Sequence, residues 1–228
     1  MEPDEIFETQ DGSHSIQSKR FGVSYHSKYG AIQESRHVFI EAGLYYKALQ
    51  QKDIAILELG FGTGLNTLLT YQEAERHGWT IFYETIEAYP ITLAQANQLN
   101  YPALLGATSL QAVFQTLHTS TWSEKHIISP HFTFQKQKKA FQDIDYQAQF
   151  DLIYFDAFAP GAQPELWEVP LLQKLYNALR LNGILVTYCA KGSVKRNFRE
   201  VGFKVEALPG PPGKREMTRC IKPAVNEL

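Results

Sequence analysis

One short segment constrains the fold of this chain more than any other. Ile54-Ala-Ile-Leu57 is an apolar run typical of a buried strand, and three glycines follow it at alternate positions in Glu58-Leu-Gly60-Phe-Gly62-Thr-Gly64. Leu65, Leu68 and Leu69 then share one side of a predicted helix. A strand, a glycine-rich turn and a helix in this order indicate an α/β protein in which the turn lets the backbone approach a ligand.

Strand-like and helix-like patterns alternate along the whole chain. Strands are predicted at residues 54–57, 80–86, 132–134, 150–155, 183–188, 203–207 and 217–221. Helices are predicted at residues 34–50 with Ser35 as N-cap, after the glycine-rich turn, after Pro90, near 110–117, from 164 to 180, and from Ser193 to Gly202. Residues 122–130 are predicted to be a loop. The alternation indicates a doubly wound, Rossmann-like α/β fold, with a mostly parallel, seven-stranded sheet and helices on both faces.

No repeat, low-complexity tract or Gly/Ser linker divides the 228 residues. A single domain over residues 1–228 is therefore expected, with an N-terminal segment and helix at 1–50 and a cofactor-binding α/β core at 51–228. The formal net charge of −2 excludes an overall basic protein, so any nucleic-acid surface must be a local patch. The acidic start and the absence of an apolar run of about 20 residues argue against a secretory signal and a membrane span, which favours the cytoplasm.

The glycine-rich turn indicates which nucleotide-like ligand is expected. A dinucleotide fingerprint needs its third glycine one position later, where this chain has Leu65, and this disfavours a nicotinamide oxidoreductase. Alternating glycines after an acidic residue suit a nucleoside with an amino-acid tail, such as S-adenosylmethionine, although a plain tight turn is the alternative. The candidate cofactor-binding residues of this segment are Glu58, Gly60, Gly62, Gly64 and Asn66.

Two further carboxylates follow predicted strands, where ligands of such sheets bind. Glu87 can accept the hydroxyls of a ribose, and Asp156 can hold an amine acceptor and take its proton as well as contact the cofactor. The rings of Phe158 and Tyr25 are candidates to attract a sulfonium. A solvated Glu87 and an Asp156 that merely caps a turn are the alternatives.

Positive charge gathers in the C-terminal quarter of the chain. The candidates for contact with an RNA backbone are Lys191, Lys195, Arg196, Lys214 and Arg215, with simple solvation as the alternative. Seven histidines and two cysteines show no ligand spacing, so no metal site is expected. Cys189 and Cys220 lie in apolar stretches and are expected to be buried.

Several segments together resemble the MnmC-type methyltransferase domain. The resemblance extends from about residue 25 to 221, and the motifs that carry it are Ile56-Leu-Glu-Leu-Gly-Phe-Gly-Thr-Gly-Leu-Asn66, Tyr154-Phe-Asp-Ala-Phe-Ala-Pro160 with Pro164-Glu-Leu-Trp167, Gly213-Lys-Arg-Glu-Met217 and Glu34-Ser-Arg-His-Val-Phe39. The resemblance implies a class I S-adenosylmethionine-dependent methyltransferase fold. It also implies methylation of the aminomethyl group on the wobble uridine of tRNA, which forms 5-methylaminomethyl-2-thiouridine.

The resemblance also implies roles for particular residues. Glu58 and the three glycines would hold the methionine part of the cofactor, Glu87 its ribose, and Asp156 the methyl-transfer site, while residues 213–217 would lie near the cofactor or the RNA. In the family, the third strand commonly ends in Gly-Asp near the adenine, where this chain has Gln137-Lys138-Lys139. Asp143 or Asp145 would replace that aspartate only through a shifted loop.

The source of the substrate and the acceptor itself leave alternatives open. Many similar proteins carry a fused flavin-dependent oxidase domain that prepares the aminomethyl group, which 228 residues are too few to include, so the substrate is expected to come from elsewhere. The alternatives are a methyltransferase that acts on another RNA or a small amine, and a nucleoside-binding module without catalysis.

Overall fold

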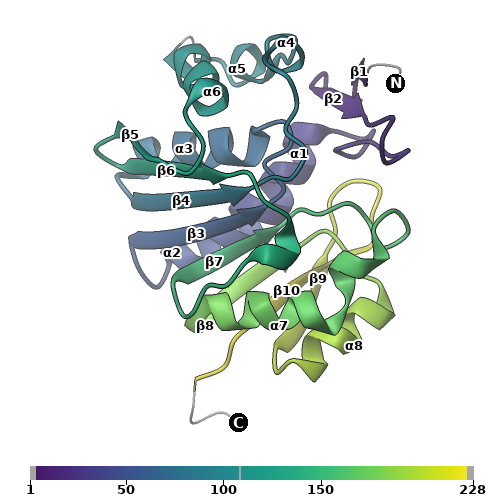
Figure 1. Cartoon of the computed structure of the whole chain (residues 1–228). Helices are drawn as coiled ribbons and strands as arrows, with labels where there is room; N and C mark the ends of the chain where they lie inside the picture. The colour runs from purple at the N-terminus through teal and green to yellow at the C-terminus, as the bar shows by residue number, and fades with distance from the viewer. Residues whose placement is uncertain (1–3, 108, 225–228) are drawn as a thin grey trace.

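An eight-stranded mixed sheet forms the centre of the computed structural model, which describes residues 4–107 and 109–224 (Figure 1). The strand order is β5-β6-β4-β3-β7-β8-β10-β9. The strands are β3 (Asp53–Leu59), β4 (Thr80–Ile86), β5 (Lys125–Ser129), β6 (Phe132–Gln137), β7 (Phe150–Phe155), β8 (Leu179–Thr187), β9 (Lys204–Pro209) and β10 (Glu216–Ile221). The pairings from β6 to β8 are parallel, and those of β5, β10 and β9 are antiparallel. The predicted doubly wound fold is confirmed.

The sheet has one strand more than the predicted seven. The additional strand, β5, lies where residues 122–130 were predicted to be a loop, and it pairs only with β6 at the edge of the sheet. Its Ile127 is 82% exposed. An edge strand held by backbone hydrogen bonds needs no core-facing apolar alternation, so the sequence lacked the pattern that would have predicted it.

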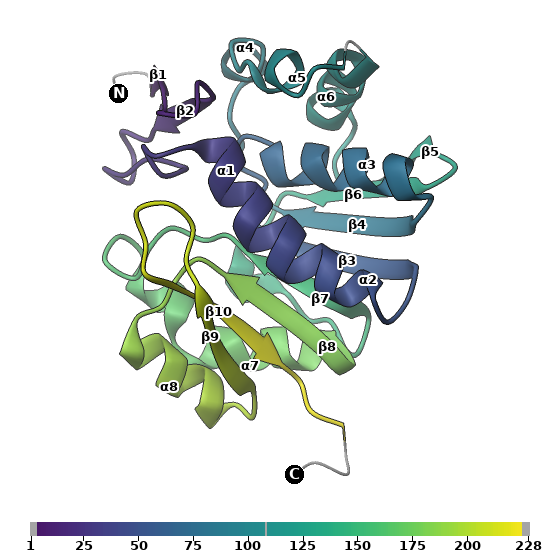
Figure 2. The ribbon, with the colours of Figure 1, turned by 180° about the vertical axis from the view of Figure 1, so that it is seen from behind.

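Helices cover both faces of this sheet. One face carries α1 (Ala31–Ser35), η1 (Arg36–Tyr45), α2 (Tyr46–Ala48) and α3 (Leu65–His77), as Figure 2 shows, and the other carries α7 (Val169–Ala178) and α8 (Gly192–Glu200). The short helices α4 (Leu93–Ala96) and α5 (Tyr101–Leu104) lie with α6 (Ser109–Thr119) near the β6 edge. The remaining elements are η2 (Phe141–Asp143), η3 (Pro164–Trp167) and a separate hairpin of β1 (Glu5–Glu8) and β2 (His14–Gln17).

Several predicted helix ends are wrong. Ser35 lies inside a helix that runs from Ala31 to Ala48, because buried Ala31 and Glu34 extend the packed face toward the N-terminus. The predicted helix from 164 to 180 is divided into η3 and α7, since Pro170 is compatible only with the first turn of a helix.

Two further predicted helix starts are displaced. Helix α4 begins after Thr92 rather than at Pro90, because Thr92 and Gln95 form a capping box. Helix α8 begins after Lys191, so Ser193 lies in its first turn.

Apolar side chains fill the space between the sheet and each helical layer. All six residues of β7 are buried, which confirms its predicted place at the centre of the parallel sheet. Cys189 and Cys220 are buried as expected. Within the described part of the chain, no helix has the length and apolarity needed to cross a bilayer, and no three side chains of the metal-binding types gather at one place.

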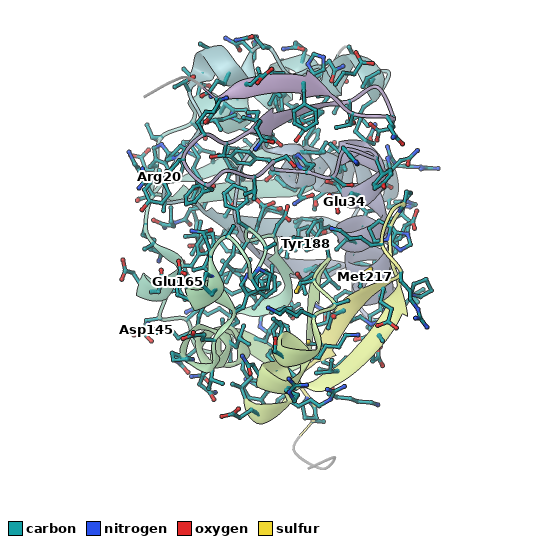
Figure 3. The ribbon with its side chains drawn as sticks, turned by 90° about the vertical axis from the view of Figure 1, so that its right-hand side faces the viewer. Arg20, Glu34, Asp145, Glu165, Tyr188 and Met217 are labelled. Atoms are coloured by element: carbon teal, nitrogen blue, oxygen red, sulfur yellow. The ribbon has the colours of Figure 1, made fainter. Side chains whose placement is uncertain are left out.

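The carboxyl ends of β3, β4, β7 and β8 lie at one edge of the sheet. From β3 the chain turns to β4 on one side and returns to β7 on the other, so the strand order reverses between β3 and β7. Figure 3 looks onto this edge, with Arg20 and Glu34 on opposite sides of it and Tyr188 between them. Ligands of doubly wound sheets bind at such a reversal.

Candidate active site

A cavity of about 400 Å³ lies at the edge where the strand order reverses. This volume is in the range of sites for small molecules and cofactors. Among the predicted cofactor-binding and catalytic residues, those that line it are Tyr25, Gly60, Gly62, Asn66, Glu87, Asp156 and Phe158. Glu58 and Gly64 are not part of its lining. Residues separated by more than 130 positions in the sequence therefore meet around one space.

The glycines at 60 and 62 allow protein groups to approach the turn closely. A Cβ atom at residue 60 would lie 2.7 Å from the carbonyl oxygen of Asp156, and one at residue 62 would lie 3.0 Å from Cδ1 of Tyr25. Both glycines also have positive φ angles, of 102° and 50°. Protein atoms alone already require glycine at these two positions, which also line the cavity. The contact of a ligand with the turn stays a prediction.

Glu58 supports the turn from behind instead of facing the cavity. Its side chain is fully buried, and Oε2 accepts hydrogen bonds from the hydroxyls of Thr85 at 2.7 Å and Thr67 at 3.2 Å. Burial raises the pKa of Glu58 to about 8. Glu58 thus links β4 and α3 through these two bonds and is not part of the cavity lining, and its predicted contact with a cofactor stays a prediction.

Glu87 is held in a fixed orientation at the end of β4. Its two carboxylate oxygens accept backbone N–H groups from Gly62 at 3.1 Å and from Tyr89 at 2.8 Å. Burial raises the pKa of this carboxyl group, and the hydrogen bonds from the backbone oppose that shift. The Gly62 bond links the glycine turn directly to the carboxylate that was predicted to bind a ribose.

Asp156 directly follows β7 and lies near the charged groups of Glu34 and Lys214. Its Oδ2 accepts a hydrogen bond of 2.8 Å from the side-chain amide of Asn66. Burial and the negative charge of Glu34 raise the pKa of Asp156 to about 7, while the hydrogen bond from Asn66 and the charge of Lys214 oppose this shift. A carboxyl group with a pKa near neutrality is suited to accept a proton from a bound acceptor.

Glu34 and Lys214 form an ion pair at the cavity, and the sequence did not predict that these two residues meet. Lys214 Nζ lies 2.6 Å from Glu34 Oε1, and the backbone N–H of Ser27 donates to Glu34 Oε2 at 2.8 Å. The Lys214 ammonium also lies 3.9 Å from the ring centroid of Tyr188. Tyr188 directly follows β8, so a search for polar residues after each strand would have found it. No local pattern in the sequence indicates that Glu34 pairs with Lys214.

Aromatic rings form another part of the cavity wall. The rings of Tyr25 and Phe158 meet edge to face with centroids 5.2 Å apart, and both residues line the cavity. Burial, followed by the charges of Glu87 and Asp4, raises the pKa of Tyr25, so its phenol is neutral at physiological pH. These two neutral rings are compatible with the predicted contact with a sulfonium.

The segment after β6 contributes no acidic side chain to the cavity lining. Ala140, Phe141 and Gln142 line the cavity, whereas Asp143 and Asp145 do not. The suggestion that one of these aspartates replaces the missing Gly-Asp is therefore not supported by the structure. Phe141 and Ala140 instead offer a flat, apolar surface on that side.

The five predicted RNA-contact residues fall into two groups. Lys195 pairs with Glu216 at 2.7 Å, and Lys214 faces the cavity, so neither ammonium is directed at solvent alone. Lys191, Arg196 and Arg215 are exposed near α8 and the β9–β10 loop. Three of the five predicted residues are thus exposed, and their contact with RNA stays a prediction.

The cavity fits a nucleoside with an amino-acid tail. Asn66 Oδ1 and Thr63 Oγ1 are buried without a hydrogen-bond partner among residues 4–107 and 109–224, and both residues line the cavity. Buried polar atoms usually have a partner, which polar groups of a ligand would supply here. The carboxylate of Glu87 offers acceptors for the hydroxyls of a ribose, and the ring of Phe141 offers a flat, apolar surface for a base.

Comparisons with known proteins agree with this geometry. The family model described as S-adenosyl-L-methionine-dependent methyltransferase matches residues 110–223, which is half of the chain. The tRNA 5-methylaminomethyl-2-thiouridine biosynthesis bifunctional proteins MnmC of Cupriavidus necator and Magnetococcus marinus are 33% and 32% identical to it. The alignments cover 88% and 90% of this chain and 32% of each relative. The chain thus spans about a third of the length of these curated relatives.

A solved structure supports the fold. The crystal structure of MNMC2 from Aquifex aeolicus superimposes with a TM-score of 0.79 at 23% identity, covering 100% of this chain and 74% of that one. The matched family model, the shared fold and the cavity at the β3–β7 reversal agree with one another. The chain belongs to the S-adenosyl-L-methionine-dependent methyltransferases, and S-adenosylmethionine is its cofactor.

Proposed function

We propose that this protein methylates the aminomethyl group on the wobble uridine of tRNA. The observation that carries this proposal is the presence of two acidic side chains, Asp156 and Glu34, at a cofactor cavity. Their negative charge suits an acceptor that arrives as an ammonium ion. The names of the MnmC relatives support an aminomethyl group on a tRNA uridine as that acceptor.

The cavity residues divide into those that hold the cofactor and those that act on the acceptor. S-adenosylmethionine supplies an electrophilic methyl group when it is bound. We assign the methionine part to Gly60, Gly62 and Asn66, with Gly64 and Glu58 as structural supports of the turn, and the ribose to Glu87. We propose that residues 1–228 form one methyltransferase domain, to whose site the N-terminal part contributes lining residues between Phe21 and Glu34.

Asp156 acts on the acceptor in this proposal. Its carboxylate accepts an N–H hydrogen bond from the amine, takes the proton and leaves the nitrogen lone pair directed toward the methyl group. Asn66 holds this carboxylate in place through its amide. The rings of Tyr25 and Phe158 exclude water from the same space. Because methyl transfer is an in-line displacement, catalysis consists mainly of positioning the acceptor.

The pH dependence of the reaction follows from the charges around Asp156. Because the deprotonated carboxylate is the active form, kcat/KM for the acceptor at saturating cofactor is expected to rise as the pH passes through about 7. Removal of the Glu34 charge lowers the pKa of Asp156, so Glu34→Gln is expected to move this rise to lower pH. The measurement is a pH–rate profile of methyl transfer.

The control for this profile is Glu165→Gln. Glu165 is an exposed carboxylate at the cavity, and it is not among the charges that shift the pKa of Asp156 (Figure 3). Its removal is expected to leave the pH at which kcat/KM rises unchanged. If this rise also stays in place in Glu34→Gln, a group other than Asp156 governs it.

On the RNA side, we propose that the exposed side chains of Lys191, Arg196 and Arg215 contact phosphates next to the anticodon. Arg215 follows Lys214 in the chain, so this basic surface extends up to the cavity.

The decisive test of the proposal is mass spectrometry of wobble nucleosides in tRNA from cells with and without the gene. Loss of 5-methylaminomethyl-2-thiouridine, with accumulation of its unmethylated aminomethyl precursor, is the expected result. Unchanged wobble nucleosides would instead favour another RNA or a small amine as acceptor. A protein that binds S-adenosylhomocysteine but whose Asp156→Ala variant changes no cellular methylation would be a non-catalytic module.

A further inference from the structure

A group of three aromatic side chains lines one part of the cavity, and two of them, Phe21 and Tyr89, have no role in the mechanism above. Phe21 comes from the segment between β2 and α1, Tyr89 from the loop after β4, and Phe158 from the loop after β7. The ring centroid of Phe21 lies 4.8 Å from that of Phe158 and 5.7 Å from that of Tyr89. All three residues line the cavity, so three distant parts of the chain supply one aromatic rim.

The outer part of this rim faces solvent. Tyr89 is 46% exposed, and the guanidinium carbon of the exposed Arg20 lies 3.6 Å from the centroid of its ring. The same guanidinium is 5.7 Å from the ring of Phe21. By contrast, the inner ring of Tyr25 is fixed against Gly62 and Phe158. The inner rings thus have a packing role, whereas the outer rings and Arg20 present flat surfaces at the opening.

These surfaces match one kind of ligand. Single-stranded RNA is recognised by bases that leave their stack and lie against aromatic rings or arginine planes. Asp156 and Glu34 line the same cavity, and Glu34 is buried, whereas Tyr89 is exposed. A base that stacks at the rim would therefore place its aminomethyl group next to those carboxylates. The positive charge of Arg20 suits the phosphate that adjoins the base.

We propose that Phe21, Tyr89 and Arg20 form a base-stacking site that holds the extruded wobble base of tRNA at the cavity mouth. This inference rests on the proposed function and adds the means by which the base is bound. The adenine of the cofactor has the same stacking chemistry, so the test must separate the two nucleobases.

The test uses Phe21→Ala and Tyr89→Ala, with Tyr89→Phe as the variant that keeps the ring. Leu93→Ala is the matched control, because Leu93 is a 50% exposed apolar residue four positions along the same segment and lies outside the cavity. Binding is measured with an anticodon stem-loop carrying 2-aminopurine at the wobble position, whose emission reports its stacking. Cofactor affinity is measured separately by calorimetry with S-adenosylhomocysteine.

Each alanine variant is expected to bind the stem-loop about tenfold more weakly, since loss of one aromatic stacking partner typically has an effect on this order. Tyr89→Phe and Leu93→Ala are expected to bind it like the wild type, and affinity for S-adenosylhomocysteine is expected to stay within about twofold in all variants. The KM for undermodified tRNA is expected to rise in parallel, with a smaller change in kcat.

Two results would overturn the inference. If the alanine variants bind the stem-loop like the wild type, the rim does not hold a base of RNA. If they lose affinity for S-adenosylhomocysteine instead, the rings stack on the cofactor. Failure of the proposed function has a different signature, because the wild type would then transfer no methyl group to aminomethyl-bearing tRNA whatever the rim variants do.

Discussion

Asp156→Ala is expected to lower the turnover of methyl transfer by about 10²- to 10⁴-fold, the usual contribution of a positioned proton acceptor. The substitution removes the carboxylate that Asn66 orients and whose pKa is raised to about 7 by burial and by the charge of Glu34. It leaves Gly62, Glu87 and the bond between them in place. Affinity for S-adenosylmethionine is therefore expected to change by less than the turnover does.

The measurement combines single-turnover kinetics with calorimetry of cofactor binding. Asp145→Ala serves as the control, because Asp145 is an exposed aspartate at the same edge of the molecule but outside the cavity (Figure 3). It is expected to match the wild type in both measurements. If Asp156→Ala instead loses cofactor affinity while the bound complex still reacts at the normal rate, Asp156 is a cofactor ligand and the proton has another acceptor.

Gly62→Val is expected to weaken binding of S-adenosylmethionine by about 10- to 100-fold. A β-branched side chain at φ 50° introduces backbone strain on the order of 1–3 kcal/mol. If the cofactor binds only to the undistorted turn, this strain opposes binding, and every 1.4 kcal/mol lowers the affinity about tenfold. The new Cβ would also lie 3.0 Å from the ring of Tyr25 and displace it. The N–H that orients Glu87 would shift with the turn. Calorimetry measures the affinity directly.

Gly106→Val separates the effect at the site from backbone strain in general. Gly106 has a similar φ of 74°, but a Cβ there meets nothing within 4 Å, and the residue is not part of the cavity. Thermal unfolding is expected to show a lower Tm for both variants, whereas only Gly62→Val is expected to lose cofactor affinity. Normal binding by Gly62→Val would mean that the turn at residues 60–64 does not hold the cofactor.

The parts of this protein that short-range patterns describe were predictable. The apolar run at 150–155 indicated a strand buried on both faces, and β7 is such a strand. The glycine-rich turn and the carboxylates at 87 and 156 were placed at strand ends, where the structure brings them to one cavity. Helix starts were less predictable, as Ser35 and Ser193 illustrate, because both serines were plausible caps but lie inside their helices. In the case of Ser35, buried Ala31 extends the packed face toward the N-terminus.

Other features of the site depend on groups that have no local signature. Glu34 and Lys214 are 180 residues apart and form an ion pair only because α1 and the β9–β10 loop reach the same edge. The position of Glu58 in the motif does not show which side chains surround it, and only the structure shows that its carboxylate accepts bonds from Thr67 and Thr85. The rim of Phe21, Tyr89 and Phe158 likewise combines three segments whose rings are unremarkable one at a time.

The sequence by itself determined the class of fold, the place of the cofactor turn and the chemistry of the strand-end carboxylates, because side-chain periodicity and backbone freedom act over a few residues. The tertiary structure alone decided which charges act on Asp156, which basic residues face solvent and which glycines are required by protein contacts. Coulombic interactions, burial and van der Waals contact depend on distance in space, and that distance is set only when the strands and loops meet at one edge.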